Sequence, residues 1–258
     1  MYDLHAHILP GADDGPKEWD KAVKMLLRAA EDGITGIVAT PHVSAGLWDN
    51  PKDKVASLVD ELKQHAGAVP IEIYTGSEIH ISPETVKGLK NGRYCTINRS
   101  RYVLVELPLH FTPDGMYDVI FSIVSGGFFP IIAHPERNPM VQQDAGVMYE
   151  MVRLGALGQV TAGSLTGTFG GEVKKLAREL VVRKLVHVIS SDAHNNGPRP
   201  PVLSHAYHDA VKLVGDKAAR AMVHDVPEMI IENMRFEPEE PEPPKKGALS
   251  FLGKWVGL

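Results

Sequence analysis

Residues 3–15 of the chain have the sequence DLHAHILPGADDG. Residues two apart on a β-strand point to the same face, so His5 and His7 can bind one cation together. Asp13 and Asp14 follow in a turn rich in glycine and proline, where loops often present ligands. For an isolated His-x-His motif, a buried strand with two hydrogen-bonded histidines is an equally good interpretation. The rest of the chain decides between the two.

Short apolar runs alternate with amphipathic stretches along the chain, which is typical of repeated βα units. After the N-terminal strand, we expect strands over residues 34–40, 71–75, 101–106, 129–133, 157–161 and 187–190. We expect helices over residues 17–32, 52–66, 114–125, 143–154, 173–183, 202–215, 217–223 and 226–234. A Gly-rich phosphate loop, which a doubly wound open sheet would place after its first strand, is absent. The pattern therefore favours an α/β fold with a closed or nearly closed barrel.

Histidines and carboxylates follow the expected strands, where barrels carry their reacting groups. The candidate ligands are His5, His7, Asp14, His42, Glu78, Glu106, His134, Asp192 and His194. A purely structural role would require all of these polar groups to reach one layer by chance. Imidazoles mixed with carboxylates suit manganese, iron, zinc or cobalt. The set is too large for one ion with about four to six ligands, so we expect two or three.

Six motifs in order along the chain resemble the PHP superfamily (polymerase and histidinol phosphatase). They are DLHAHILPGADDG, ATPH, GSEIH, VELP, AHPER and SSDAHNNGPRPP, and the resemblance runs from residue 1 to about residue 234. Within the superfamily, the chain is most similar to the metal-dependent tyrosine-protein phosphatases of capsular and exopolysaccharide operons. The resemblance implies a distorted (β/α)7 barrel of the PHP type in residues 1–235. It also implies a trinuclear centre, often of Mn²⁺, with Fe, Zn, Co or Mg as alternatives.

The same resemblance implies a role for each candidate residue. His5, His7, Asp192 and a bridging Glu78 would hold one ion. Glu78, Glu106 and His134 would hold a second ion, and Asp14, His42 and His194 a third. Asp3 would orient a ligand histidine. Arg137 and Arg199 would bind the phosphate, because guanidinium forks match phosphate oxygens.

The implied substrate is the phosphotyrosine-rich tail of a membrane-bound bacterial tyrosine kinase that regulates capsule or exopolysaccharide synthesis. Two alternatives remain open from the sequence. One is a PHP phosphatase for a small phosphomonoester such as histidinol phosphate or a nucleotide. The other is a catalytically silent module that docks on the kinase.

A different catalytic motif competes with the metal-centred interpretation. Cys95 and Arg101 satisfy the C-x5-R pattern of cysteine-dependent tyrosine phosphatases. That loop cradles phosphate with backbone N–H groups and leads into a helix, whose N-terminus lowers the thiol pKa. No glycine lies between the two residues, and the next segment is an expected strand. We therefore predict that Cys95 is a small, partly buried packing residue.

The composition is that of an ordinary globular protein of 258 residues, with 43% hydrophobic and 23% charged residues. A net charge of −5 argues against a broad nucleic-acid-binding surface, and we expect no such partner. The lone Cys95 excludes an internal disulfide and is typical of a reducing compartment. Neither a membrane-length apolar run nor a secretory signal is found, so we expect a cytoplasmic location. The sequence does not indicate the oligomeric state.

The composition changes abruptly beyond residue 235. We expect residues 236–258 to form an acidic, Pro-rich linker (EPEEPEPP, residues 237–244) and a short apolar tail with basic residues. On a helix, Leu249, Leu252 and Val256 would share one face, bordered by Trp255. Such a tail could contact the inner, anionic face of the membrane or dock on the kinase. A terminus without a docking role is an equally good interpretation.

Overall fold

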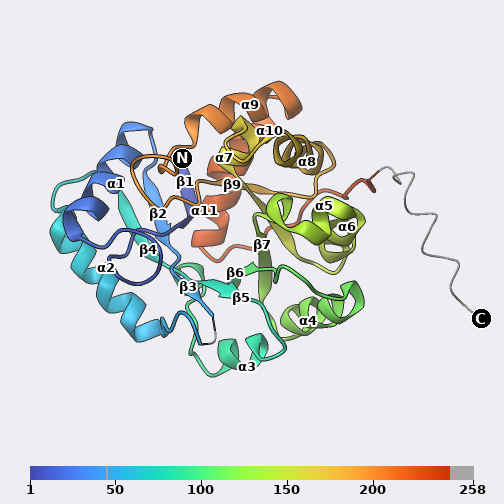
Figure 1. Ribbon diagram of the computed structural model, residues 1–258, viewed down its shortest axis with the longest axis horizontal. Helices are drawn as coiled ribbons and strands as arrows, with labels where there is room; N and C mark the ends of the chain where they lie inside the picture. Colours follow the sequence, from blue (N-terminus) through green and yellow to red (C-terminus); the bar gives the residue numbers. More distant parts are fainter. Residues whose placement is uncertain (45, 245–258) are drawn as a thin grey trace, which may run out of the picture.

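The computed structural model describes residues 1–44 and 46–244 (Figure 1). Its strands are β1 (Tyr2–Ala6), β2 (Gly36–Ala39), β3 (His42–Val43), β4 (Glu72–Thr75), β5 (Glu78–His80), β6 (Tyr102–Glu106), β7 (Phe129–Ala133), β8 (Leu157–Thr161) and β9 (Val188–Ser190). Its α-helices are α1 (Trp19–Glu31), α2 (Lys52–Ala66), α3 (Thr85–Lys90), α4 (Pro113–Ser125), α5 (Pro139–Gln143), α6 (Gly146–Arg153), α7 (Ala162–Thr166), α8 (Gly171–Val182), α9 (Ser204–Val214), α10 (Asp216–Arg220) and α11 (Val226–Ile231). Shorter helical turns are η1 (Ile97–Arg99), η2 (Pro135–Arg137) and η3 (Ala221–Asp225).

All pairings between these strands are parallel, and they form two sheets. The first has the order β1-β2-β4 and the second β3-β5-β6-β7-β8-β9. Two residues, Thr40 and Pro41, separate β2 from β3, and two others separate β4 from β5. Each of these pairs is therefore one barrel strand that changes sheet partway along its length. Counted in this way, the described strands form the distorted seven-stranded parallel barrel that was expected.

The two sheets also meet beside β1. The backbone N–H of His7 donates to the carbonyl of Ala193, and that of Asp192 donates to the carbonyl of His5, both over 2.8 Å. These bonds join the end of β1 to the loop after β9. The barrel is thus closed at the position where the first and last strands carry candidate ligands.

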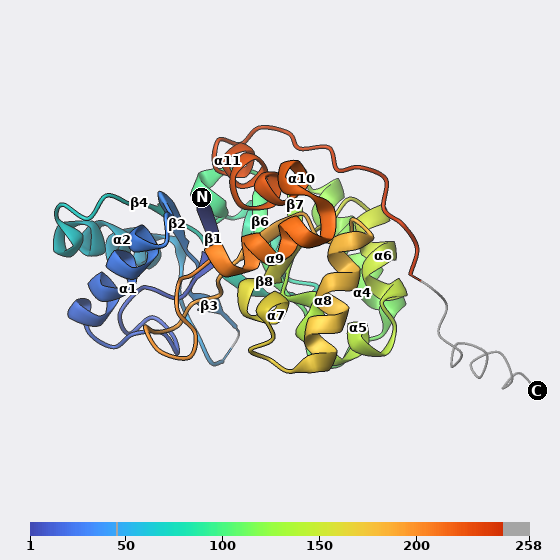
Figure 2. The same cartoon turned by 90° about the horizontal axis from the view of Figure 1, so that it is seen from above.

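Helices form an outer ring around the strands, as Figure 1 shows. Their buried faces follow the expected helical spacing; in α1, for example, Ala22, Met25, Leu26 and Ala29 pack into the core. A second apolar cluster joins residues of the strands to Val226, Ile230 and Ile231 of α11. The hydroxyl of Tyr2, at the start of β1, donates to Glu228 of the same helix. Helix α11 therefore closes the amino-terminal end of the barrel and leaves the carboxyl ends for the site (Figure 2).

The predicted elements were correct in type, and residues 52–66, 129–133 and 157–161 match their predicted bounds. Helices α3, α5 and α7 were missed because each is only five or six residues long, too short for a clear apolar period. The predicted helix over residues 143–154 begins later, at Gly146. The helix predicted over 217–223 is divided into α10 and the π-helical turn η3.

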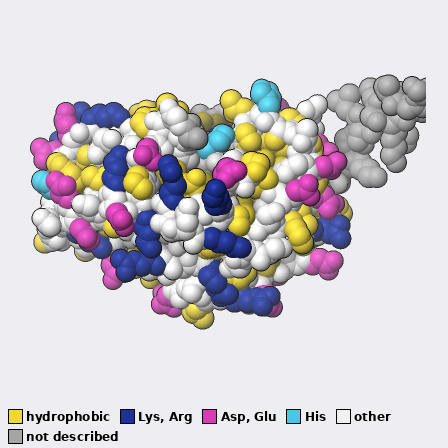
Figure 3. Space-filling model, turned by 90° about the horizontal axis from the view of Figure 1, so that it is seen from below, with side chains coloured by type: hydrophobic (Ala, Val, Ile, Leu, Met, Phe, Trp, Pro, Cys, Tyr) yellow, Lys and Arg dark blue, Asp and Glu magenta, His cyan; other side chains and the backbone are white. Residues whose placement is uncertain are grey.

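Residues 236–244 lie against the domain. The backbone N–H of Glu242 donates to the carbonyl of Arg183 over 2.9 Å, and Lys184 pairs with Glu239 at 2.7 Å. The predicted tail falls on residues 245–258 and so lies outside the described residues, and the division at residue 235 stays a prediction. Among the described helices, none is both long and apolar enough to cross a membrane. The face in Figure 3 exposes charges of both signs, with Lys and Arg gathered toward its middle.

Candidate metal centre

The predicted site residues lie at or after the carboxyl ends of the strands. His5 and His7 come from the end of β1, His42 from β3, Glu78 from β5 and Glu106 from the end of β6. His134 follows β7, and Asp192 and His194 follow β9. His134 and Asp192 have left-handed backbone conformations, with φ of +33° and +52°. Such conformations are uncommon for residues other than glycine and tend to occur at functional sites.

His5 and His7 form the buried centre of the cluster. Their Nε2 atoms lie 3.1 Å apart, and both side chains are fully buried. Two unprotonated imidazole nitrogens at this distance repel each other, so a cation, either a proton or a metal ion, belongs beside them. The opposite ring nitrogens have partners of their own. Nδ1 of His5 lies 2.9 Å from Oε1 of Gln159, and Nδ1 of His7 lies 2.6 Å from Oδ2 of Asp13. These contacts aim both Nε2 atoms at the centre.

Glu78 contributes one carboxylate oxygen to three imidazoles. Its Oε2 lies 2.9 Å from Nδ1 of His42, 3.2 Å from Nε2 of His5 and 3.3 Å from Nε2 of His7. Its Oε1 lies 2.7 Å from Nε2 of His134. Burial opposes ionisation of Glu78, but the surrounding histidines hold the pKa of its carboxyl well below the usual value. An ionised carboxylate with this many facing donors is suited to bridge two metal ions.

Asp192 connects the histidines to the two arginines. Its Oδ1 lies 3.4 Å from Nε2 of both His5 and His7, whereas its Oδ2 lies 2.6 Å from Nη2 of both Arg137 and Arg199. Burial opposes its ionisation, but His5 and Arg137 hold the pKa of the Asp192 carboxyl well below its usual value. One carboxylate therefore faces the candidate metal ligands on one side and the candidate phosphate-binding groups on the other.

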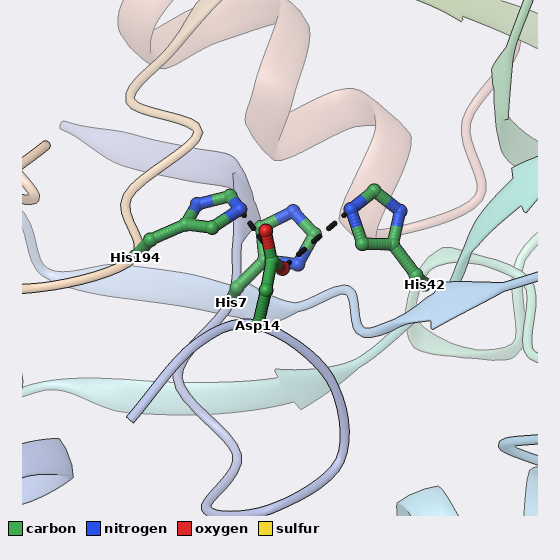
Figure 4. Close-up of side chains that lie close together, drawn as sticks. All are labelled: His7, Asp14, His42 and His194. Carbon is green, nitrogen blue, oxygen red and sulfur yellow. Dashed lines mark ion pairs between the residues drawn. The ribbon is translucent and has the colours of Figure 1, made fainter. Parts of the chain in front are cut away.

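A third set of ligands lies nearer to solvent (Figure 4). Oδ1 of Asp14 is 3.2 Å from Nε2 of His194 and 3.7 Å from Nε2 of His42, and Figure 4 shows these side chains converging with His7. The hydrogen bond from His194 lowers the pKa of Asp14. The site therefore extends from a buried centre at His5 to the half-exposed carboxylate of Asp14.

Four groups of side chains place ligand atoms within 4.8 Å of one another. They are His5–His7–Asp192, His5–Glu78–His134, His42–Glu78–Glu106 and His7–Asp14–His42–His194. All nine predicted ligands thus belong to one network. Glu106 and His134, which were predicted to share an ion, belong to different groups here, with 3.9 Å between Oε1 and Nε2. The distribution of ions among the groups stays a prediction.

Asp3 contacts the backbone, and not the ring, of the candidate ligand His5. Its carboxylate contacts no histidine ring; it accepts hydrogen bonds from the backbone N–H of His5 and from the N–H and hydroxyl of Ser191. Burial raises the pKa of Asp3 to about 6. Asp3 therefore joins the backbone of β1 to the loop after β9. The ring-orienting contacts belong instead to Asp13, beside Asp14 in the first turn, and to Gln159, which carried no sequence signal.

A cavity of about 300 Å³ opens over the cluster. Its lining includes Asp14, His42, Glu106, His134, Arg137, Asp192, His194 and Arg199. Metal ligands and both arginines therefore face the same space. A small anionic group placed there would contact guanidinium groups and metal ions at once, which is the arrangement that stabilises a phosphoryl group during transfer.

Cys95 does not have the environment of a nucleophile. The residue is buried in the main apolar core, where its Sγ lies 3.8 Å from the carbonyl oxygen of Lys52. Burial raises the pKa of its thiol to about 11. The segment after it is the short turn η1 and then strand β6. A thiolate, the form needed for attack, is therefore disfavoured at neutral pH.

Comparison with known proteins gives a consistent assignment. Residues 1–232 match the family model for CpsB/CapC of capsular polysaccharide synthesis. The CapC protein of Staphylococcus aureus is 38% identical over 211 residues, which are 81% of this chain and 83% of CapC. The tyrosine-protein phosphatase YwqE of Bacillus subtilis (strain 168) is 31% identical over 96% of this chain and 98% of its own length.

The fold agrees with that of a solved structure. The chain matches, with a TM-score of 0.91 and 31% identity, a crystal structure from the set of YwqE from Bacillus subtilis and CpsB from Streptococcus pneumoniae. Those two proteins are metal-dependent tyrosine phosphatases. The match covers 95% of this chain and 100% of the other. The chain therefore belongs to the CpsB/CapC family of tyrosine-protein phosphatases of capsular polysaccharide synthesis.

Proposed function

We propose that this chain hydrolyses phosphotyrosine on a membrane-bound bacterial tyrosine kinase that regulates capsule or exopolysaccharide synthesis. In this proposal, two or three divalent ions, Mn²⁺ by preference, are held by the nine predicted ligands. The observation that carries the proposal is the position of Asp192, whose two oxygens face the His5–His7 pair and both arginines. Metal ligation and phosphate binding thereby meet at one side chain.

The donor set fits metal ions. The Nε2 atoms of His5 and His7 face each other, and their Nδ1 atoms are held by Gln159 and Asp13. Neighbouring histidines, and Arg137 in the case of Asp192, favour the ionised carboxylates of Glu78 and Asp192, so both side chains offer anionic oxygens to a bound metal ion. Bound divalent ions would lower the pKa of water and screen the charge of the phosphate. Mixed nitrogen and oxygen ligands accommodate manganese as well as iron, zinc or cobalt.

Arg137 and Arg199 would bind and orient the phosphate. Nη2 of Arg199 donates a hydrogen bond to Asp192, and Nη2 of Arg137 forms an ion pair with the same carboxylate. Their Nε atoms are buried with no hydrogen-bond partner among the described residues. Two guanidinium groups can contact several phosphate oxygens and hold phosphorus in line for attack. The oxygen of a water molecule or hydroxide forms the new bond to phosphorus, and tyrosinate leaves with the phenolic oxygen. Because the pKa of phenol is about 10, this leaving group requires no strong general acid.

The choice of a phosphoprotein over a small phosphomonoester rests on family membership. A substrate panel tests it: kcat/KM is measured for phosphotyrosyl peptides from a capsule-system kinase, for the same peptides with phosphoserine, for histidinol phosphate and for a nucleotide. We expect the phosphotyrosyl peptides to be hydrolysed with the highest kcat/KM. A preference for histidinol phosphate or the nucleotide would establish the small-molecule alternative. No hydrolysis of any substrate by the fully metallated protein would favour a silent docking module.

A further inference from the structure

A phenylalanine ring lies under one of the two proposed phosphate-binding arginines. Cζ of Arg137 is 4.9 Å from the centroid of the Phe169 ring. On its other side, Nη2 of Arg137 lies 2.6 Å from Oδ2 of Asp192. The guanidinium group thus forms an ion pair at one nitrogen and lies over the face of an aromatic ring.

The conformation of the loop that carries Phe169 brings the ring close to Arg137. Gly167, with φ of +103°, ends α7, and Gly170, with φ of +95°, precedes α8. The backbone N–H of Thr168 donates to the carbonyl of Gly163 over 2.8 Å. A Cβ atom at Gly163 would lie 3.0 Å from the Phe169 ring. The ring can occupy this position because Gly163 has no side chain.

The backbone around Arg137 is tied to the same loop. Glu136, which precedes Arg137 in η2, is fully buried. Its Oε1 accepts hydrogen bonds from the backbone N–H of Thr161, over 3.0 Å, and from the hydroxyl of Ser164 in α7, over 2.6 Å. Helix α7 thus anchors the main chain beside Arg137 through its first turn and leads directly to Phe169 at its other end. The segment from α7 to Phe169 therefore contacts both the main chain beside Arg137, through Glu136, and the guanidinium group of Arg137, through the phenyl ring.

We propose that Phe169 is a positioning residue for Arg137, holding the plane of the guanidinium group so that its free N–H groups point into the cavity over the metal cluster. This deepens the proposed function and rests on Arg137 binding the phosphate. An arginine over the face of an aromatic ring gains a cation–π interaction, which is stronger where the pair is shielded from water. A side chain already held in its binding orientation also loses less conformational entropy on contacting the phosphate.

The competing role for Phe169 is simple packing between α7 and α8. Three substitutions distinguish the two roles. Phe169→Tyr keeps the aromatic face, Phe169→Leu keeps most of the apolar volume without it, and Phe129→Leu is the matched control. Phe129 makes an equivalent contact, with Cζ of Arg101 also 4.9 Å from its ring, but lies at the start of β7, away from the site.

The measurement is kcat/KM for a phosphotyrosyl peptide, with metal content and melting temperature determined for each variant. We expect Phe169→Leu to lower kcat/KM by about 3- to 10-fold, while Phe169→Tyr and Phe129→Leu stay within about 2-fold of wild type. In the Arg137→Ala background, Phe169→Leu should have almost no further effect, since its target is gone.

Two results would overturn the positioning role. One is a Phe169→Leu protein with wild-type kcat/KM; the other is an equal loss with and without Arg137. Failure of the proposed function gives a different result: either the wild-type protein does not hydrolyse the phosphotyrosyl peptide, or Arg137→Ala itself keeps wild-type kcat/KM. If Phe169→Leu lowers the melting temperature so far that the assay fails, Gly163→Ala serves instead, because its added methyl displaces the ring. The same dependence on Arg137 is then expected, and a loss independent of Arg137 would contradict the proposal.

Discussion

Nη2 of Arg137 and Oδ2 of Asp192 lie 2.6 Å apart, and Arg199 reaches the same oxygen at the same distance. The other oxygen of Asp192 faces His5 and His7. This geometry joins the candidate phosphate-binding groups to the metal ligands through a single carboxylate. Because the arginines and the histidines contact different oxygens of Asp192, changes to the arginines and changes to the candidate ligands should affect different measurable quantities.

Replacement of either arginine should reduce catalysis but not metal binding. Each charge-assisted contact to the phosphate contributes about 2–4 kcal/mol in the transition state, so Arg137→Ala and Arg199→Ala should each lower kcat/KM by about 30- to 1000-fold. Metal content should stay near that of wild type. The control is Arg153→Ala, because that side chain is 59% exposed and its partner in the ion pair is Glu150, on the same exposed face of α6. Wild-type kcat/KM in both site variants would show that phosphate is bound elsewhere.

Replacement of Asp13 should act in the opposite way, through metal affinity. Its Oδ2 holds Nδ1 of His7 at 2.6 Å and accepts the backbone N–H of His42. Loss of such a contact behind a ligand typically weakens metal binding by about 10- to 100-fold. We expect Asp13→Asn to raise the Kd for Mn²⁺ by that factor, measured by calorimetric titration of the metal-free protein. Asp49→Asn is the control, since that carboxylate is 76% exposed. Equal Kd values for the two variants would exclude an orienting role for Asp13.

A buried histidine away from the cluster should make the fold sensitive to acid. Burial lowers the pKa of His187 from 6.5 to about 4, and its Nδ1 accepts the backbone N–H of Gly158. Between pH 6.5 and about pH 4, His187 binds a proton in the unfolded chain but not in the folded chain. The free energy of unfolding therefore decreases as the pH falls through this range. From pH 7 to pH 5 this loss is about 2 kcal/mol.

Urea unfolding of the metal-free protein measures this effect. His187→Gln keeps an acceptor for Gly158 but cannot titrate in this range. The free energy of unfolding of wild type should fall by about 2 kcal/mol more than that of the variant between pH 7 and pH 5. Parallel pH dependences would show that His187 does not contribute.

The C-terminal tail should affect association and leave chemistry unchanged. Deletion of residues 245–258 removes Lys245, Lys246, Lys254 and the apolar residues around Trp255. Hydrolysis of a small aryl phosphate should be unaffected, while co-sedimentation with anionic vesicles or binding to the kinase should decrease. If vesicle and kinase binding both remain unchanged, the tail has no docking role.

The sequence predicted the barrel and the convergence of the nine candidate ligands because both depend on local patterns. Apolar runs mark the strands, and the residues at their carboxyl ends must meet at one end of a parallel barrel. The change of sheet between β2 and β3, and between β4 and β5, has no such signal in the sequence, because it depends on how the strands pair across the barrel. Gln159 was missed for a similar reason: it lies within strand β8 and reaches His5 only through the fold. The sequence did not indicate which group of His5 the Asp3 carboxylate contacts, because proximity along the chain does not decide between the ring and the backbone.

Phe169 illustrates a further limit of sequence analysis. Its contact with Arg137 joins residues on either side of β8, and its place is made by the absence of a side chain at Gly163. The short helix α7, between β8 and α8, carries no amphipathic period that would reveal this arrangement. Relationships of this kind depend on three-dimensional packing and become visible only in the structure.

The central claim is that bound metal ions, and not the thiol of Cys95, are required for phosphotyrosine hydrolysis. The most direct measurement is a titration of metal-free wild-type and Cys95→Ser proteins with Mn²⁺, following bound metal and turnover of a phosphotyrosyl peptide together. We predict no turnover in either metal-free protein and the same rise in both, complete at two or three ions per chain. Full turnover by the metal-free wild-type protein, or an inactive but folded and metallated Cys95→Ser protein, would contradict the account.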